Sequence, residues 1–150
     1  MKKLITILTL LLFLSPMRNY SQLPDPPPLV NRFTKATSHQ ELEAWIREVR
    51  DHQKLMKAEV IGQSAEGRNL VAMLFSSGYF GQDSSKVKVL IFAQQHGNEQ
   101  SGKEGALLLA AELMKPENFA LFEHIDLALI PQVNPDGSEK HLRRNSREVD

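Results

Sequence analysis

The sequence predicts an α/β fold in which a mixed, mostly parallel sheet is flanked by helices. Two apolar runs typical of strands, residues 87–93 and 125–130, are separated by 31 residues. A crossover of this length that contains a helix joins two parallel strands. Residues 59–62 and 70–75 are a second pair of strand-like runs, and the short polar segment between them predicts an antiparallel hairpin. Together the four runs predict a mixed sheet.

The start of the chain predicts an export signal. Lys2 and Lys3 precede an apolar run of 11 residues, 4–14, which a Ser-Pro pair interrupts. A run this short suits the apolar part of a signal peptide better than a membrane span, which needs about 20 residues. We therefore expect residues 1–21 to be a signal peptide and the protein to be secreted or periplasmic. The alternative is a membrane-anchored N-terminus.

Residues 22–31 are expected to form a Pro-rich linker. Four of the eight prolines lie between positions 22 and 29. Consecutive prolines fix φ and remove hydrogen-bond donors, which predicts an extended spacer outside the sheet. Residues 32–150 then make up the folded domain.

A helix is expected to begin at Ser38. Ser38 followed three positions later by Glu41 is a capping-box pattern, which marks the start of a helix. Apolar residues then recur at i, i+3, i+4 and i+7 and form one stripe: Leu42, Trp45, Ile46 and Val49. Because Trp45 lies on this stripe, we interpret it as a core residue rather than as a stacking platform for a ligand.

The remaining elements follow from apolar runs and prolines. Residues 87–93 are almost continuously apolar, which is typical of a strand buried on both faces. Residues 105–114 predict a helix that ends before Pro116. Residues 125–130 are the next strand, and we expect this strand to lie at the uncovered edge of the sheet.

The composition limits the possible chemistry. The 150 residues include 18 basic and 18 acidic side chains, and without residues 1–21 the counts become 15 and 18. This balance gives no electrostatic reason to expect a nucleic acid or a membrane surface as a partner. The chain has no cysteine, which excludes disulfides, Cys-ligated zinc and a thiol nucleophile. Any metal site must therefore use histidine and carboxylate ligands.

Polar clusters follow both parallel strands, at residues 94–99 (QQHGNE) and 132–137 (QVNPDG). Since open α/β sheets bind ligands outside the carboxyl ends of their strands, we expect the clusters to lie together at one edge. His96 and Glu99 are three residues apart, so their side chains can converge on one cation, and Gly97 allows the tight backbone that this requires. Both are ordinary zinc ligands, and a catalytic zinc typically takes three protein ligands and a water. The alternative for such a pair is a solvated turn or a capping pair.

The second cluster leads into a basic tail. Residues 134–137 (NPDG) are expected to form a β-turn. The tail then holds five basic side chains within eight positions: Lys140, His141, Arg143, Arg144 and Arg147. Such a run is either a solvated face or, beside a zinc site, a set of cations that hold anionic groups.

Two stretches, residues 94–106 (QQHGNEQSGKEGA) and 131–150 (PQVNPDGSEKHLRRNSREVD), resemble the N-terminal signature blocks of zinc carboxypeptidases of the carboxypeptidase A type. Residues 61–70 (IGQSAEGRNL) are similar to the hairpin that precedes these blocks in bacterial members. The resemblance covers residues 32–150. It implies that His96 and Glu99 are two ligands of a catalytic Zn²⁺ and that Arg143, with Arg144 as the alternative, stabilises the oxyanion formed from the scissile carbonyl. The substrate that it implies is the C-terminus of a peptide or protein.

The resemblance also implies parts that residues 1–150 do not contain. These are a third, histidine ligand, a glutamate general base, a tyrosine, and an Asn-Arg pair that grips the terminal carboxylate of the substrate. The other histidines are interpreted as surface or capping residues: His39, His52, His124 and His141.

We therefore expect a zinc-dependent metallocarboxypeptidase, of which this chain is an N-terminal part that is inactive by itself. One alternative is a zinc amidase or deacylase that acts on acyl-amino acids or cell-wall peptides, since such enzymes share the His-x-x-Glu block. The other is a non-catalytic exported fragment.

Overall fold

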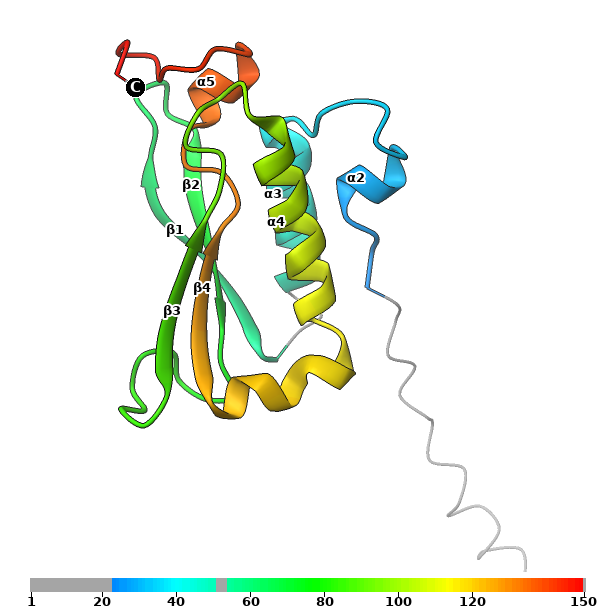
Figure 1. The fold of residues 1–150 in the computed structure, drawn as a ribbon, viewed down its shortest axis with the longest axis vertical. Helices are drawn as coiled ribbons and strands as arrows, with labels where there is room; N and C mark the ends of the chain where they lie inside the picture. The colour runs from blue at the N-terminus through cyan, green and yellow to red at the C-terminus, as the bar shows by residue number, and fades with distance from the viewer. Residues whose placement is uncertain (1–22, 51–53, 150) are drawn as a thin grey trace, which may run out of the picture.

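The described part of the chain forms a four-stranded mixed sheet with helices against one face (Figure 1). The computed structural model describes residues 23–50 and 54–149. In chain order the elements are α2 (Pro27–Val30), α3 (His39–Arg50), β1 (Met56–Gln63), β2 (Asn69–Phe75), β3 (Val87–Phe92), α4 (Gln100–Leu113), the 3₁₀ helix η1 (Pro116–Glu123), β4 (Ile125–Ile130) and α5 (Pro135–Glu139). The strand order is β1-β2-β4-β3. The α/β prediction with a mixed sheet is thus confirmed.

The predicted start of α3 is confirmed, including both hydrogen bonds of the capping box. The Ser38 Oγ accepts a hydrogen bond from the Glu41 amide at 3.2 Å, and the Glu41 carboxylate accepts one from the Ser38 amide at 2.9 Å. Lys35 lies 2.5 Å from the same carboxylate. The Lys35 contact, followed by the Ser38 amide, lowers the pKa of Glu41 to about 2. Lys35 and the capping box together therefore favour the charged form of this carboxylate.

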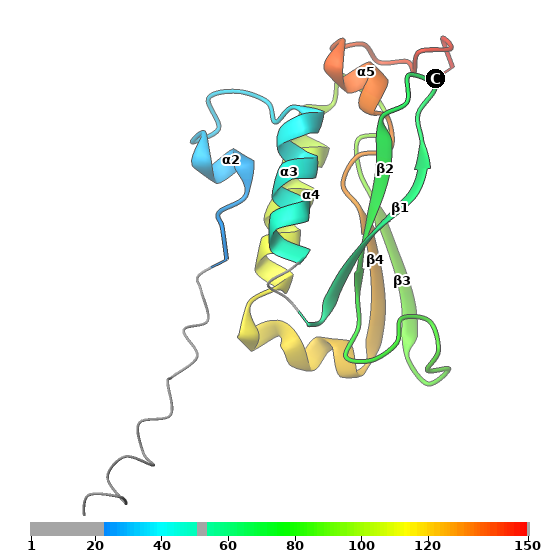
Figure 2. The ribbon, with the colours of Figure 1, turned by 180° about the vertical axis from the view of Figure 1, so that it is seen from behind.

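The apolar stripe of α3 packs into the core, as predicted. Its four residues are almost fully buried and share one cluster with Phe75 and Leu129 of the sheet and Leu107 of α4. Trp45 is a core residue, and its indole nitrogen donates a hydrogen bond to the Pro24 carbonyl at 3.0 Å. Both long helices lie on the same side of the sheet, which Figure 2 shows from behind.

The hairpin is also confirmed, with longer strands than the sequence predicts. Strands β1 and β2 pair antiparallel from Met56 opposite Phe75 to Gln63 opposite Asn69. The register shifts between Val60 and Gly62, which marks a bulge. The turn closes with a hydrogen bond of 2.8 Å from the Ser64 amide to the Arg68 carbonyl.

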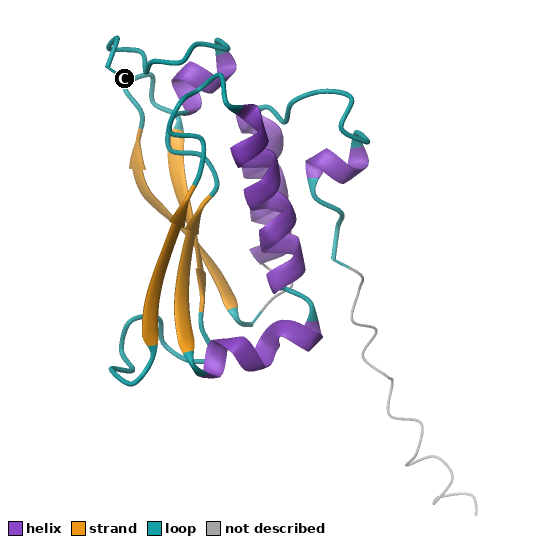
Figure 3. Cartoon of the chain, in the orientation of Figure 1, coloured by secondary structure: helices purple, strands orange, loops and turns teal. Residues whose placement is uncertain are grey.

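The parallel pairing of β3 and β4 is confirmed, but the burial predicted for both strands is wrong. Strand β4 lies between β2 and β3, whereas β3 is the edge strand of the described sheet. Leu90 and Phe92 are 62% and 53% exposed. Val89 and Ile91 pack against the core, so Leu90 and Phe92 point to the opposite face. Within the described residues no helix covers that face (Figure 3).

The crossover differs from its prediction in detail. Helix α4 begins at Gln100, five residues before the predicted start, and ends before Pro116 as expected. The 3₁₀ helix η1 then begins at Pro116, a residue that ends one helix and suits the first turn of the next. Phe122 of η1 is fully buried and stacks on Phe75, with ring centroids 5.5 Å apart. The crossover thus closes one end of the core.

The Pro-rich segment is not an extended spacer over its whole length. Residues Pro27–Val30 form the short helix α2, and Pro26 and Pro28 are buried. Proline at the first helical positions is compatible with this start. The predicted signal peptide, residues 1–21, lies outside the described residues, and the domain boundaries remain predictions. None of the helices described is long and apolar enough to span a membrane.

Introducing a lysine at Leu90 or at its neighbour Ile91 of β3 should affect the free energy of unfolding very differently. Leu90→Lys places the ammonium on the face that no described helix covers, so it should change the free energy of unfolding by at most about 0.5 kcal/mol. It should also reduce self-association, because an exposed apolar edge strand pairs readily with other strands. Ile91→Lys is the matched control and should cost about 3 kcal/mol, since it forces a charge against the core. Urea unfolding and sedimentation measure both effects, and equal destabilisation would contradict the assigned faces.

The capping box predicts a pH-dependent contribution from Glu41. Glu41→Gln keeps an oxygen that can accept the Ser38 amide but removes the charge that Lys35 stabilises. Because the pKa of Glu41 is lower in the folded chain, its charge stabilises the fold above the ordinary value of 4.5, and this contribution is lost as the pH falls towards about 2. Above pH 5 we expect the variant to be less stable by at most about 1 kcal/mol, given the partial exposure of this pair. Unfolding curves at pH 7 and pH 2.5 measure the difference, which should shrink at the lower pH.

Candidate metal centre

The loops after β3 and β4 lie side by side at the carboxyl edge of the sheet, as predicted. The Ala93 amide donates to the Ile130 carbonyl at 2.9 Å, and the Val133 amide donates to the Ala93 carbonyl at 3.1 Å. These bonds continue the parallel ladder beyond the strands. In Figure 1 both loops lie at the same end of the sheet as α5.

His96 and Glu99 converge at this edge. The His96 Nδ1 lies 2.9 Å from the Glu99 Oε1, and the Glu99 amide donates to the His96 carbonyl at 3.1 Å. The second bond forms the turn that brings the two side chains together. Among the residues described, no group of three or more histidine and carboxylate side chains is arranged to hold a metal. His96 and Glu99 thus form a pair of neighbouring candidate ligands.

Arg143, from the tail, reaches the same pair. Its Nη2 lies 2.9 Å from the His96 Nε2, and its Nη1 lies 3.6 Å from the Glu99 Oε1. A guanidinium can only donate, so Nε2 is the accepting nitrogen and Nδ1 carries the hydrogen that faces Glu99. The Arg144 guanidinium instead lies 3.9 Å from the Glu148 carboxylate. Of the two arginines named from the sequence, Arg143 is the one whose guanidinium contacts His96.

Gly97 is required by close packing. A Cβ on Gly97 would lie 2.1 Å from the Gly137 carbonyl carbon and 2.4 Å from the Ser138 amide nitrogen. The Gly97 amide also donates to the Arg143 carbonyl at 3.0 Å. The expected need for glycine is correct, but its cause is backbone contact between the two loops.

The predicted β-turn at residues 134–137 is instead the first turn of helix α5. Asn134 is its N-cap and accepts the Gly137 amide at 3.0 Å, while Pro135 occupies the first helical position. The Asn134 side-chain amide also donates to the Gln95 carbonyl at 3.2 Å. The same residues that favour a turn also start a helix, and here the chain continues helically. Asn134 was not among the predicted site residues.

Asp136 joins the hairpin to the loop that carries Arg143. Its buried carboxylate accepts hydrogen bonds from Arg68 at 2.6 Å, Ser64 at 2.7 Å and Ser146 at 3.0 Å. Burial raises the pKa of Asp136, but these bonds lower it more, so the net shift is downward. A charged Asp136 therefore fixes three segments at once. The spacing of single motifs gives no sign of this cluster, because its members are up to 82 positions apart.

The basic tail is a largely exposed face. Its residues 140–144 are exposed, and Lys140 pairs with Glu66 of the hairpin turn. Of the remaining histidines, His124 and His141 are exposed as expected, and His52 lies outside the described residues. Of the surface or capping position expected for His39, the surface position is wrong: this histidine is the first residue of α3, is 8% exposed and contacts Gln132.

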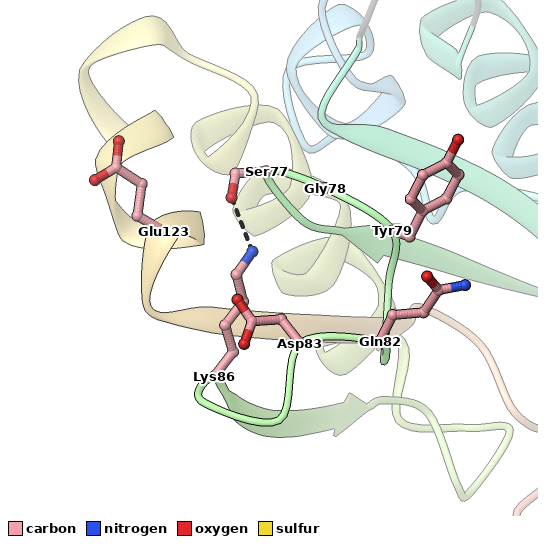
Figure 4. Close-up of a pocket in the computed structure, with 7 residues that line it drawn as sticks. All are labelled: Ser77, Gly78, Tyr79, Gln82, Asp83, Lys86 and Glu123. Atoms are coloured by element: carbon pink, nitrogen blue, oxygen red, sulfur yellow. Dashed lines mark hydrogen bonds between the residues drawn. The ribbon is translucent and has the colours of Figure 1, made fainter.

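A shallow pocket lies at the other end of the sheet. It has a volume of about 450 Å³ and is lined by Ser77, Gly78, Tyr79, Gln82, Asp83, Lys86 and Glu123. Figure 4 shows the Lys86 ammonium directed at Ser77, to which it donates at 2.8 Å, and it also donates to the Phe122 carbonyl at 2.8 Å. Lys86 therefore ties the loop after β2 to η1. His96 and Glu99 are not among the residues that line this pocket.

Comparisons with known proteins agree on one family. A family model described as zinc carboxypeptidase matches residues 42–148. Carboxypeptidase Z from Mus musculus is 30% identical over 119 residues, which are 75% of this chain and 18% of that protein. Carboxypeptidase E from Caenorhabditis elegans is 35% identical over 88 residues, which are 55% of this chain and 19% of that protein.

A solved structure agrees with these relatives. The crystal structure of carboxypeptidase A from Helicoverpa armigera superposes with a TM-score of 0.68 at 26% sequence identity. The superposition covers 75% of this chain and 29% of that one. The chain thus spans about a fifth of the length of the curated relatives that it matches.

Gly97→Ala is expected to separate the two loops. The added methyl group meets backbone atoms that cannot rotate away, so we expect a loss of at least about 2 kcal/mol in the free energy of unfolding. Gly105→Ala is the matched control: a Cβ there meets nothing within 4 Å, and the site is exposed within α4. The control should gain about 0.5–1 kcal/mol from helix propensity. Denaturant unfolding measures both, and a tolerated Gly97→Ala would contradict the backbone contact.

Proposed function

Because the chain belongs to the zinc carboxypeptidase family, we propose that it provides part of the catalytic centre of a zinc-dependent metallocarboxypeptidase. The reaction is hydrolysis of the peptide bond that joins the C-terminal residue to a peptide or protein. The observation that supports this most directly is the meeting of His96, Glu99 and Arg143 at the carboxyl edge of the sheet.

The donor atoms of His96 and Glu99 suit zinc. An imidazole nitrogen and a carboxylate oxygen are ordinary zinc ligands, and here the Nδ1 and the Oε1 face each other at 2.9 Å. These two residues would hold the metal, with a further ligand from outside the described residues. A bound zinc lowers the pKa of its water and polarises a carbonyl oxygen.

Arg143 is the residue to which we assign stabilisation of the oxyanion. Its planar guanidinium carries several donors, so it can stabilise negative charge as it develops on the substrate carbonyl. Its backbone carbonyl is held by Gly97, which fixes the segment beside the ligands. Half of the side chain is exposed, so a substrate can reach it.

Arg143 lies beside both candidate ligands. In the arrangement described, the His96 Nε2 accepts from Arg143 and Nδ1 carries the hydrogen that faces Glu99. With a metal held by His96 and Glu99, the Arg143 guanidinium beside them would add positive charge next to the substrate carbonyl.

We place the working protein outside the cytoplasm, since the start of the sequence has the charge and apolar pattern of a signal peptide. We also expect the 150-residue chain to have no useful turnover on its own. Two ligands leave the coordination that a catalytic zinc needs incomplete, and loss of a general base alone commonly costs about 10²–10⁴-fold in rate.

Zinc titration of the purified 150-residue chain tests the assigned ligands. We expect weak zinc binding that His96→Ala and Glu99→Ala each abolish, measured by calorimetry and by the imidazole NMR signals. His124→Ala is the control, because His124 is exposed at the opposite end of β4. Unchanged zinc binding by the His96→Ala variant would overturn the assignment.

A second experiment tests the catalytic role in any longer polypeptide that contains this chain. Arg143→Lys should lower kcat by about 10²–10³-fold on peptides with a free C-terminus, the usual cost of losing an oxyanion donor. Arg144→Lys, the same change one residue away, should leave kcat nearly unaltered. Equal losses in both variants, or hydrolysis of acyl-amino acids or cell-wall peptides in place of peptide C-termini, would contradict the proposal.

A further inference from the structure

Gln94 has a strained backbone next to the candidate metal ligands. It follows β3 directly, and its φ is +53°, in the left-handed region. Residues other than glycine rarely adopt this conformation, and Asn or Asp adopts it more readily than Gln. This left-handed conformation changes the direction of the chain between β3 and His96, which lies two residues after Gln94. Such outliers persist where surrounding contacts fix them, often at functional sites.

The side chain of Gln94 supplies those contacts. It is 4% exposed, and its amide nitrogen lies 3.0 Å from the Gly97 carbonyl and 2.9 Å from the Ser138 Oγ. The nitrogen is also 3.0 Å from the Gln100 Oε1, so one of its two hydrogens is shared. One amide therefore joins the middle of the His96–Glu99 loop to both α4 and α5.

The opposite end of the Gln94 amide is held as well. Its Oε1 accepts from the Gln132 amide at 2.8 Å, and the Gln132 Oε1 lies 2.7 Å from the His39 Nδ1. Because that oxygen can only accept, the His39 Nδ1 is a donor. The hydrogen bonds therefore run in one direction, from the start of α3 through two buried amides to the loop.

Buried Lys103 supports the other side of this network. Its ammonium donates to the Gln100 Oε1 at 2.8 Å and lies 3.3 Å from the Ser138 Oγ, the two groups that Gln94 also contacts. It donates to the Thr37 carbonyl as well. Two acceptors of the Gln94 amide are thus themselves fixed, which lets the network resist movement of the loop.

We propose that Gln94 is a positioning residue, whose buried amide holds the loop of residues 95–99 so that His96 and Glu99 face a common point. The side chain does not contact either ligand side chain in the contacts described. It acts through the Gly97 carbonyl, which lies between them in the sequence. The link to metal binding rests on the proposed function, whereas the link to loop order does not.

Amide hydrogen exchange of the metal-free chain tests the loop. Gln94→Asn keeps a residue that accepts left-handed backbone but is too short for these contacts, and Gln94→Gly removes both the strain and the side chain. In both variants the Gly97 and Glu99 amides should exchange about tenfold faster or more, since each loses the support of hydrogen-bonded neighbours. Gln95→Asn is the matched control, because the same change is made at an exposed side chain.

The pattern of exchange separates positioning from a general structural role. Amides in the pairing of β2 with β4 should keep their rates within about threefold in both variants, because the opening is local. A uniform increase through the sheet, loss of the whole fold in both variants, or normal loop protection in Gln94→Gly would each overturn the proposal. The last result would assign the role to the backbone alone.

Zinc titration, followed by the His96 imidazole signals, gives the second readout. The affinity of the Gln94→Asn variant should fall about 10–100-fold, the usual cost of removing support for metal ligands, and that of Gln95→Asn should not change. If the unaltered chain binds no zinc, the proposed function fails, and hydrogen exchange still decides the positioning role. If zinc binds equally to all three proteins, the positioning of ligands is refuted while the proposed function stands.

Discussion

The contact between Gly97 and Gly137 is the constraint on which the rest of the site depends. Parallel pairing of β3 and β4 brings two loops to one edge of the sheet, but pairing alone leaves their separation open. The absence of a side chain at Gly97 lets the backbones touch, since a Cβ there would lie 2.1 Å from the Gly137 carbonyl carbon. A Cβ on Gly137 would lie 2.6 Å from the Arg144 carbonyl oxygen, so this glycine allows close packing within its own segment. With the loops in contact, the Gly97 amide reaches the Arg143 carbonyl, and the Arg143 side chain reaches His96. The arginine and the histidine that meet in this way are 47 positions apart in the sequence.

Local patterns in the sequence predict most of this arrangement, and two of the failures share one physical cause. The capping box of α3, the hairpin, the parallel pair and the convergence of His96 with Glu99 each depend on residues a few positions apart or on one crossover length. The burial of β3 depends instead on what lies beside the strand, and apolar residues at 87–92 look the same whether or not a second layer covers them. The network of Gln94, Gln132 and His39 also joins residues 38 to 93 positions apart. No spacing within a single motif can reveal it.

The exposed face of the sheet also depends on what packs beside the strands and not on a local sequence pattern. Parallel strands normally carry helices on both faces, because their connections place helices there. Here α3 and α4 lie on one face, and the apolar side chains of Leu90 and Phe92 occupy the other. The structural relative from Helicoverpa armigera is matched over 29% of its length, so the matched region is one part of a larger fold in that protein. Within the described residues, the apolar strand β3 is buried on one face.

The candidate site combines exposed side chains with a buried hydrogen-bond network. The Glu99 and Arg143 side chains are about half exposed. Below them the side chains of Gln94, Gln132 and Lys103 are almost completely buried, and each is hydrogen-bonded on more than one side. A buried network of this kind has few alternative arrangements, since any movement leaves a polar group without a partner at a cost of about 1–3 kcal/mol. The support reaches His39 at the first position of α3. The helix start that Ser38 and Glu41 define in the sequence is therefore also one end of the structure that holds the candidate metal ligands.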